Sequence, residues 1–253
     1  MPHGGGGPGV GPICVAKHLV DFFPSHAVVK TGGEQGIHAV SAAPYGSVSM
    51  LPVTYGYLLM LGAEGLKYVT EMAILNANYL ASSFEKLGFK ILFKGKQGRV
   101  GHEMIWDCSA FNKEYGISEL DIAKRLMDFG FHAPTLSFPV HGTLMVEPTE
   151  SEPKEELDRF IEALKTIREE MCEVAEGKAD KTDNVLKNAP HTHKVLTADE
   201  WTHTYPRSKA AYPLPWVAEN KFWPQVGRVD DGYGDRNLMC TCDPLYDYVN
   251  DEN

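Results

Sequence analysis

Two short pairs of metal-binding residue types stand out in the sequence. His191 and His193 form a His-x-His pair, and Cys240 and Cys242 form a Cys-x-Cys pair. Ligand pairs of a zinc site are usually separated by about two to four residues, so one intervening residue is short. The sequence also offers no second well-spaced pair to complete a tetrahedral set. We therefore expect no metal site, and we expect these cysteines to line a pocket or to lie half-buried.

The stretch VGHEMIWD, residues 100–107, joins a histidine directly to a glutamate. The second histidine of a His-Glu-x-x-His metalloprotease motif does not follow. His102 and Glu103 are neighbours on an expected strand, so their side chains point to opposite faces of the sheet. These two residues are therefore not expected to converge on one ion.

The acidic run VEPTESE, residues 146–152, could hold a cation. Thr149 and Glu152, however, have the spacing of a helix capping box, and Pro153 suits the first turn of a helix. Acidic residues at a helix N-terminus also complement the helix dipole. We favour a helix start over a cation site.

The chain opens MPHGGGGPGVGPI, and glycines within residues 4–9 formally satisfy the dinucleotide motif G-x-G-x-x-G. That fold needs a strand before the glycines and a helix after them, and Pro8 and Pro12 disfavour the helix. A P-loop would need Gly-Lys-Ser/Thr, which does not follow. Two interpretations stay open: a flexible terminal segment, or a loop whose backbone approaches a ligand or neighbouring subunit closely.

The elements that would position these residues follow from apolar periodicity. Three segments have helical spacing and end near a glycine; they are 69–87, 118–129 and 153–176. Three others have strand character; they are 89–93, 100–107 and 142–148. This order predicts an α/β fold class, with an α+β layer in which helices cover one sheet.

Composition sets further bounds. The 253 residues carry a net charge of −10, which argues against non-specific nucleic-acid binding. No apolar run approaches the length of a membrane span, and the N-terminus lacks the pattern of a signal peptide, so we expect no membrane partner. Five scattered cysteines suit a reducing compartment.

The chain divides by composition into three parts. Residues 1–60 are rich in small residues and proline, residues 61–177 hold the periodic elements, and residues 178–253 lose periodicity. The last part is rich in aromatic residues, unlike a disordered tail. We expect it to extend over a neighbouring domain or subunit and bury its rings there.

Several stretches together resemble one family. They are PHGGGGPGVGPI, SAAPYGSVSMLP, EMAILNANYL, GFHAPTLSFPVHGTLMVEPTESE, ELDRFIEAL, AAYPLPW and ENKFWPQVGRVDDGYGDRNLMCTC. All are similar to the C-terminal end of the glycine cleavage system P-protein, the pyridoxal-phosphate-dependent glycine dehydrogenase (decarboxylating). The resemblance covers residues 2–245.

The resemblance implies a fold and a reaction. The chain would hold the end of the large domain of a fold type I pyridoxal-phosphate enzyme, then its small C-terminal domain and a long wrapping tail. The complete enzyme would decarboxylate glycine, release CO₂ and transfer the aminomethyl group to the lipoyl arm of H-protein. It would be a dimer or heterotetramer, cytoplasmic in a bacterium or in the mitochondrial matrix of a eukaryote.

In the family, the cofactor lysine lies a few residues before the glycine run. The sequence begins at Met1, so we expect no catalytic lysine here and an inactive chain unless it joins the remainder of the P-protein or a companion subunit. A non-catalytic module that binds H-protein or full-length P-protein is the alternative. Another fold type I enzyme, such as an aminotransferase, is disfavoured because the stretch 221–242 resembles the P-protein.

The resemblance also assigns candidate site residues. Those expected at the cofactor or the subunit interface are His3, Gly4, Gly5, Gly6, Gly7, Ser41, Tyr45 and Ser47. Those expected along the substrate channel are His132, Thr135, Cys240 and Cys242. A structural role competes in each case: close packing for the glycines, a turn for 41–47 and a core position for His132.

Overall fold

The computed structural model describes residues 10–238, and the chain divides into two compact units. The first unit comprises the chain up to residue 82, residues 93–104 and residues 147–157. The second unit comprises residues 83–92, residues 105–146 and the chain from residue 158 onward. Both units are therefore assembled from segments that lie far apart in the sequence.

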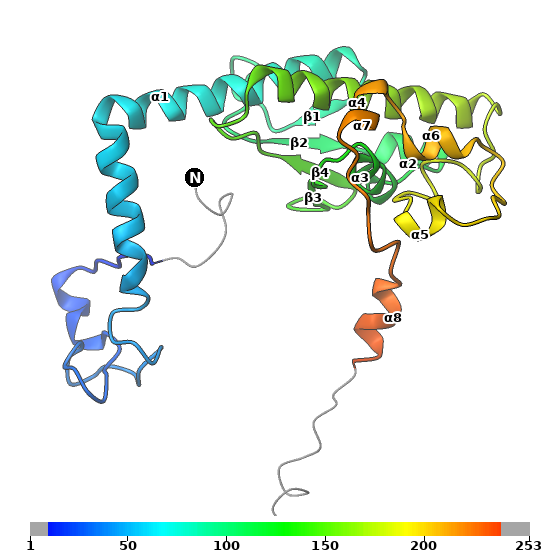
Figure 1. Cartoon of the computed structure of the whole chain (residues 1–253). Helices are drawn as coiled ribbons and strands as arrows, with labels where there is room; N and C mark the ends of the chain where they lie inside the picture. The colour runs from blue at the N-terminus through cyan, green and yellow to red at the C-terminus, as the bar shows by residue number, and fades with distance from the viewer. Residues whose placement is uncertain (1–9, 239–253) are drawn as a thin grey trace, which may run out of the picture. The chain divides into compact units, whose positions relative to one another are not determined.

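The first unit begins with loops and two short 3₁₀ helices, η2 (Lys17–Phe22) and η3 (Val48–Met50). The long helix α1 (Leu51–Lys86) follows and is interrupted at Gly62, where φ is 60° and ψ is −174°. Figure 1 shows α1 changing direction sharply along its length. A positive φ of this kind favours glycine, which explains how one helical segment can turn into another here.

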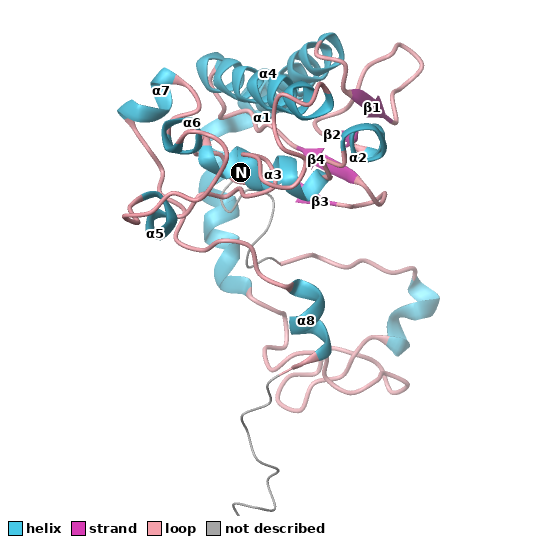
Figure 2. Ribbon diagram, turned by 90° about the vertical axis from the view of Figure 1, so that its right-hand side faces the viewer, coloured by secondary structure: helices cyan, strands magenta, loops and turns pink. Residues whose placement is uncertain are grey.

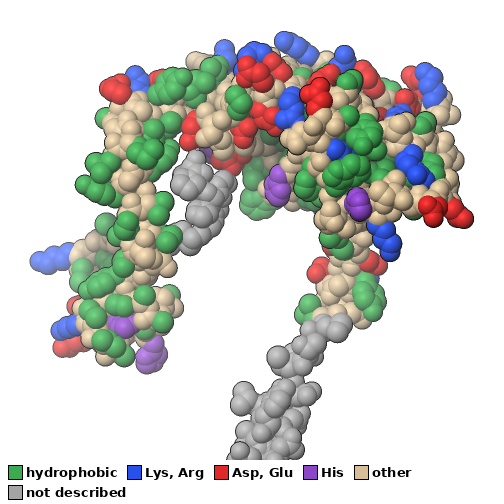
Figure 3. Space-filling view, viewed as in Figure 1, with side chains coloured by type: hydrophobic (Ala, Val, Ile, Leu, Met, Phe, Trp, Pro, Cys, Tyr) green, Lys and Arg blue, Asp and Glu red, His purple; other side chains and the backbone are tan. Residues whose placement is uncertain are grey.

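The first unit buries little apolar surface in its N-terminal part. Among the described residues 10–75, no hydrophobic side chain is buried. Val28 and Met60 are 86% and 87% exposed, and green hydrophobic side chains are visible along the first part of α1 in Figure 3. Burial of apolar area is the main force that offsets the entropy lost on folding, so this region gains little from it.

The remaining segments of the first unit are joined by two asparagines on α1. The Asn76 side-chain amide donates to the carbonyl of Thr149 at 2.9 Å and to that of Glu152 at 3.3 Å. Asn78 donates to the Val100 carbonyl at 2.9 Å and accepts from its N–H at 3.1 Å. These bonds hold Val100 and residues 149–152 against α1 at Asn76 and Asn78. They also give the backbone groups of those segments the hydrogen-bond partners that polar groups need when they leave water.

The second unit is built on a four-stranded sheet of order β1-β2-β4-β3. Its strands are β1 (Lys90–Leu92), β2 (Met104–Asp107), β3 (Thr135–Leu136) and β4 (Thr143–Val146). β1 runs antiparallel to β2 with Ile91 opposite Trp106, and β3 runs antiparallel to β4 with Leu136 opposite Leu144.

Helices pack on this sheet around an aromatic core. Phe84, at the end of α1, stacks on Trp106 of β2 with ring centroids 5.1 Å apart. The Phe84 ring also meets Phe160 of α4 (Lys154–Ala175) at 5.8 Å. Figures 1 and 2 both show α4 lying along the sheet, while α3 (Glu119–Asp128) packs against β3 and β4. A shorter helix, α2 (Ser109–Tyr115), buries Phe111.

Between α4 and residue 238, the last described residue, the chain adds four short helices, α5 (His193–Leu196), α6 (Arg207–Ala211), α7 (Pro215–Glu219) and α8 (Asp231–Arg236). Leu196, Ala210 and Ala211 form a small buried cluster there. Three aromatic side chains pack against it, Trp201, Tyr205 and Trp223. The aromatic residues of this segment thus contribute to packing within the second unit.

The predicted α/β character is confirmed at the level of a mixed helix and strand domain with one four-stranded sheet. Two expectations stay predictions: that the chain is part of a fold type I pyridoxal-phosphate enzyme, and that it divides into parts at residues 60 and 177. The helix predicted from residue 69 begins at Leu51 instead, and α2 and β3 were not expected. The prediction that Thr149 caps the following helix is wrong, because α4 starts only at Lys154. The Thr149 hydroxyl instead accepts a hydrogen bond from the N–H of Ser151 at 3.2 Å.

Candidate functional site

Three of the predicted cofactor residues lie in one loop of the first unit. Ser41 donates its hydroxyl to the Ala43 carbonyl at 2.7 Å, and Ser47 lies just before η3. The Tyr45 ring is 64% exposed. His26 reaches the same loop through its Nε2, which lies 3.0 Å from the Ala42 oxygen. The loop therefore supplies exposed hydroxyl groups, but the Ser41 hydroxyl is already used within the loop.

The other predicted residues fall elsewhere. His132 and Thr135 are exposed in the second unit, where Thr135 lies on β3 opposite Met145. The remaining predicted site residues lie outside the described residues; they are His3, Gly4, Gly5, Gly6, Gly7, Cys240 and Cys242. All these assignments stay predictions. His132 does not occupy a core position, so the competing structural interpretation of that residue is wrong.

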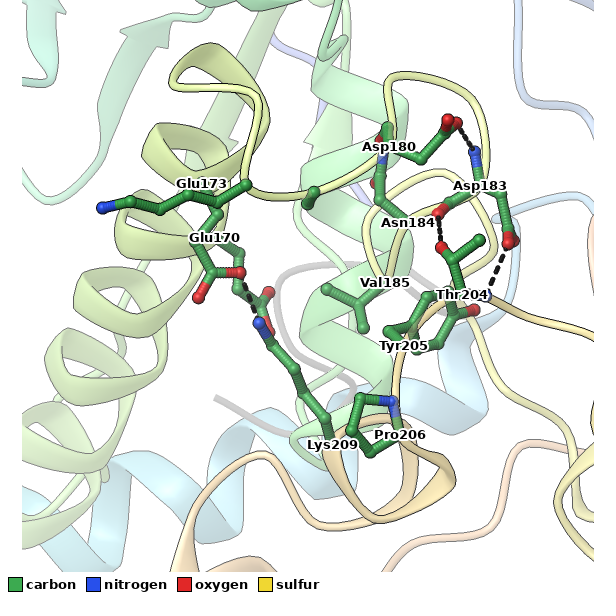
Figure 4. Close-up of a pocket in the computed structure, with 12 residues that line it drawn as sticks. Glu170, Glu173, Asp180, Asp183, Asn184, Val185, Thr204, Tyr205, Pro206 and Lys209 are labelled. Atoms are coloured by element: carbon green, nitrogen blue, oxygen red, sulfur yellow. Dashed lines mark hydrogen bonds and ion pairs between the residues drawn. The ribbon is translucent and has the colours of Figure 1, made fainter.

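A polar cavity of about 300 Å³ lies in the second unit (Figure 4). It is lined by Glu170, Glu173, Lys178, Ala179, Asp180, Asp183, Asn184, Val185, Thr204, Tyr205, Pro206 and Lys209. Glu173 and Lys209 form an ion pair across it. Asp183 accepts from the Thr204 N–H at 2.7 Å and lies 2.7 Å from His203 Nδ1. The charged groups at this cavity thus already have partners, some in the lining and others outside it.

A buried network stands behind that cavity. The Arg125 guanidinium donates to Glu170 through Nε at 3.0 Å and through an NH2 group at 2.6 Å, and it donates to Asp128 at 2.9 Å. Asp128 accepts from the His191 N–H at 2.7 Å and lies 2.7 Å from His191 Nδ1. His191 Nε2 in turn lies 2.8 Å from the Tyr205 hydroxyl. We call these five residues the Arg125 network.

The protonation states of the Arg125 network follow from its geometry. Burial pushes the pKa of Asp128 upward, but hydrogen bonds from His191 and the charge of Arg125 outweigh it and hold that pKa below its usual range. Burial raises the pKa of Tyr205, which therefore stays a neutral phenol. The two ring nitrogens of His191 face different partners, Nδ1 the Asp128 carboxylate and Nε2 the Tyr205 hydroxyl. Every member is satisfied, so the network is a structural element.

The partners of His191 bear on the His-x-His pair. His191 of the His-x-His pair is fully engaged by Asp128 and Tyr205. Within residues 10–238, no three His, Cys, Asp or Glu side chains gather as metal ligands would.

A second cavity, of about 330 Å³, lies entirely within the first unit. It is lined by Tyr57, Val69, Thr70, Ala73, Ile74, Gly101, His102, Glu147, Pro148, Thr149 and Glu150, and we call it the α1 groove. Residues of α1 form one wall of the groove. The other lining residues, 101–102 and 147–150, belong to segments that the hydrogen bonds of Asn76 and Asn78 hold against that helix. Its lining is mainly apolar.

Polar groups are concentrated in two places in the α1 groove. His102 Nε2 lies 3.8 Å from a carboxylate oxygen of Glu147, and the Tyr57 hydroxyl donates to Glu150 at 3.4 Å. The backbone N–H of Glu150 itself lowers the pKa of that carboxyl, so Glu150 is ionised at neutral pH. An apolar channel with two carboxylates can hold an apolar ligand that carries a positive charge.

Sequence reasoning did not identify the α1 groove. It considered His102 only beside its neighbour Glu103, concluded that these two side chains do not converge, and treated residues 146–152 as a helix start. The structure instead places His102 beside Glu147, 45 positions further along the chain. No local motif predicts that His102 lies near Glu147, because their segments are held together by the hydrogen bonds of Asn76 and Asn78 on α1.

Sequence comparisons bear on which protein family this architecture belongs to. Residues 69–191 match the family model described as "Glycine dehydrogenase, C-terminal domain". Residues 69–191 are thus similar to the C-terminal domain of glycine dehydrogenases. The resemblance expected from the sequence is therefore confirmed.

Similarity to glycine dehydrogenases extends beyond this domain. The chain is 61% identical to glycine dehydrogenase (decarboxylating) of Flavobacterium johnsoniae over 98% of its length and 26% of that protein. It is 56% identical to the Bdellovibrio bacteriovorus protein of the same name, again over 98% of the chain and 26% of the relative. The mitochondrial protein of Dictyostelium discoideum is 57% identical over 98% of the chain and 25% of the relative.

The chain thus spans about a quarter of the length of the curated relatives it matches. Those relatives include bacterial proteins and one named as mitochondrial. Among the described helices, none combines the length and the apolar character needed to cross a membrane.

Proposed function

We propose that this chain serves as the C-terminal part of a glycine dehydrogenase (decarboxylating). The complete assembly decarboxylates glycine with pyridoxal phosphate and transfers the aminomethyl group to the lipoyl arm of H-protein. The observation that carries this proposal is identity of 56–61% along 98% of the chain to proteins of that name. Such continuous similarity includes the glycine dehydrogenase C-terminal domain as well as the segments on both sides of it.

The described residues supply at most part of a cofactor site. Hydroxyl groups of Ser41, Tyr45 and Ser47 are donors of the kind a phosphate accepts, yet the Ser41 hydroxyl donates to Ala43 within its own loop. Bound pyridoxal phosphate would supply an electron sink for decarboxylation. This chain would contribute the loop around residue 45 to one side of the site, and the remainder of the enzyme would complete it.

The exposed apolar surface of the first unit supports the proposal that another part of the enzyme completes the site. Residues 10–75 bury no hydrophobic side chain, whereas a self-sufficient folded segment of this size would bury several. We infer that the remaining part of the dehydrogenase polypeptide, or a companion subunit, covers this surface.

Reconstitution tests the proposal. This chain and the remaining part of the Flavobacterium johnsoniae enzyme are produced together and supplied with pyridoxal phosphate, lipoylated H-protein and glycine labelled in its carboxyl group. We expect labelled CO₂ from the pair and none from either part alone. Absence of CO₂ from a pair that forms a stable complex would refute the proposal.

A non-catalytic role is the alternative, and the same exposed surface favours it because such a surface suits any binding partner. The chain would then bind H-protein or a full-length glycine dehydrogenase without restoring decarboxylation. Co-purification with and without lipoylation of H-protein, run beside the CO₂ assay, separates the two functions. Binding without CO₂ release supports the alternative.

A further inference from the structure

Two neighbouring residues of the first unit hold the loop that carries the predicted cofactor hydroxyls. Ser25 donates twice to the Ile37 carbonyl, through its N–H at 2.7 Å and through its hydroxyl at 2.8 Å. His26 Nε2 lies 3.0 Å from the Ala42 oxygen. The segment from 37 to 42 is therefore attached at both ends to one short stretch of chain. These contacts matter because no described hydrophobic side chain of this region is buried and could hold the loop instead.

The backbone around His26 decides which of its ring nitrogens carries the proton. The N–H groups of Val28 and Val29 donate to Nδ1 at 3.2 Å and 3.4 Å. A neutral imidazole has one nitrogen that accepts and one that donates, so Nε2 carries the proton and donates to the Ala42 oxygen. His26 thus joins a local turn to a carbonyl 16 positions further along the chain.

The Ala42 carbonyl lies in a turn that is closed by its own hydrogen bonds. The neighbouring Ala43 carbonyl accepts from the Ser41 hydroxyl at 2.7 Å and from the Gly46 N–H at 3.3 Å. The bond from His26 attaches this closed turn to another segment of the chain. Loss of that one bond would leave the turn intact but free to move as a unit.

Two exposed hydroxyl groups follow directly in the same loop. Among residues 10–238, neither the Tyr45 nor the Ser47 hydroxyl makes a hydrogen bond, and Ser47 does not cap η3 with its side chain. Both residues are exposed. Each hydroxyl can therefore donate to a phosphate oxygen.

We propose that His26 is a positioning residue for the cofactor phosphate, acting through the Ala42 carbonyl on the hydroxyls of Tyr45 and Ser47. This inference rests on the function proposed above, which assigns pyridoxal phosphate to the complete assembly. His26 itself does not touch the phosphate, because both of its ring nitrogens are already engaged. Its bond restricts the positions that the two hydroxyls can sample, which lowers the entropic cost of binding the phosphate.

Two substitutions separate the two functions of the His26 ring. The side chain of His26→Asn places an acceptor near the position of Nδ1, so it keeps the turn with Val28 and Val29. It is too short to donate to Ala42. The longer side chain of His26→Gln places an amide N–H near the position of Nε2 and can restore that bond. His18→Asn is the matched control, since His18 is an exposed histidine of η2.

Proteolysis of the 253-residue chain measures the positioning in the absence of cofactor. Chymotrypsin cleavage after Tyr45 should be about three- to tenfold faster in His26→Asn than in the parent, because one hydrogen bond no longer holds the turn. His26→Gln and His18→Asn should be cleaved at the parent rate. Cleavage of His26→Asn at the parent rate would overturn the proposal.

Cofactor affinity measures the consequence of that positioning. Pyridoxal phosphate is titrated, with absorbance detection, into the reconstituted pair of this chain and the remaining part of the enzyme. His26→Asn should raise the dissociation constant about three- to tenfold, and His26→Gln should recover most of the affinity. Pyridoxal, which lacks the phosphate, should bind the parent and His26→Asn equally. The urea midpoint should be the same in all variants, whereas a merely structural role would lower it.

The parent pair decides the proposed function, and the comparison of variants decides the role of His26. If the parent pair releases CO₂ and His26→Asn binds pyridoxal phosphate as tightly as the parent, this inference alone is refuted. If the parent pair binds the cofactor without releasing CO₂, the proposed function fails while the affinities still decide the role of His26. A parent pair that binds no pyridoxal phosphate refutes both.

Discussion

The two ends of the described chain differ in what they bury. Residues 10–75 leave every hydrophobic side chain at least partly exposed, although the region is rich in them. The second unit encloses side chains that are almost wholly buried, including Phe84, Trp106, Leu126 and Leu164. Helix and loop formation in the first region therefore cannot be explained by its own core, whereas the second unit can be explained that way.

This difference indicates which part of the chain contributes most to the free energy of unfolding. Packing of apolar area and satisfaction of buried charge both occur in the second unit. The first region instead leaves its apolar side chains at least partly exposed, and exposed apolar area is a usual property of interaction surfaces. Mutations that test this contrast should have large effects in one region and small effects in the other.

The strongest test compares two phenylalanines. Phe84→Ala should lower the free energy of unfolding by about 3–5 kcal/mol, because a cavity opens between Trp106 and Phe160. Phe22→Ala should change it by less than about 0.5 kcal/mol, since Phe22 is 52% exposed. Urea unfolding followed by tryptophan fluorescence measures both. A comparable loss for Phe22→Ala would break the contrast.

The Arg125 network offers a test of similar size. Arg125→Ala leaves Glu170 and Asp128 buried without their cation, and it should destabilise the chain by about 3–5 kcal/mol. Arg236→Ala, an exposed arginine on α8, is the matched control and should cost less than about 0.5 kcal/mol. A loss below about 1 kcal/mol for Arg125→Ala would mean that water or other groups compensate the two carboxylates.

A smaller, pH-dependent effect is expected at Asp121. Burial raises the pKa of this carboxyl, but bonds from Lys187, Ser118 and Arg228 outweigh that and lower it. A lowered folded-state pKa stabilises the protein above the unfolded value of about 3.9 and loses that stabilisation as pH falls below it. Asp121→Asn should therefore cost about 1–3 kcal/mol at pH 7 and progressively less below about pH 4.

Unfolding free energies of the Asp121 variant and the parent, measured from pH 7 to pH 3, check this expectation. Glu169→Gln provides the comparison at an exposed acid and should show no such convergence. A difference between Asp121→Asn and the parent that stays constant across this range would contradict the assigned role.

The smallest effect is expected at the start of α3. Ser118 accepts from the Asp121 N–H at 3.3 Å, and Asp121 accepts from the Ser118 N–H at 2.9 Å. Ser118→Ala should lower the free energy of unfolding by about 1 kcal/mol. Ser118→Thr keeps the hydroxyl, which also donates to the Asp121 carboxylate at 3.0 Å, and should recover most of the loss. If the two variants are equally unstable, capping is not the cause.

Much of the second unit could be predicted from the sequence because its elements bury one face. The apolar spacing that ends at Gly130 and the capping residue Ser118 predict α3 correctly. The first part of α1 could not be found in this way. Residues 51–68 include Pro52 and three glycines and bury no apolar stripe, so the helical period is absent from that stretch.

The candidate site was harder to predict for a different reason. Sequence patterns give information about residues that are close together in the chain. The α1 groove instead brings together Tyr57, His102 and Glu147, which are far apart in the sequence. Hydrogen bonds made by Asn76 and Asn78 hold the segments in place. A lone asparagine in a helix carries no signal for such a long-range role. The local rule applied to His102 and Glu103 correctly kept these neighbours apart, but it could not indicate Glu147, the residue that the fold places beside His102.

Asp121 and Asp128 lie two helical turns apart on α3, and both receive partners from beyond residue 186. A premature stop codon before Lys187 would remove Lys187, His191 and Arg228 in one event. The shortened product would retain the acidic residues of α3 without three of their donors. Its cellular fate would then be decided by quality-control proteases more than by any loss of the groove.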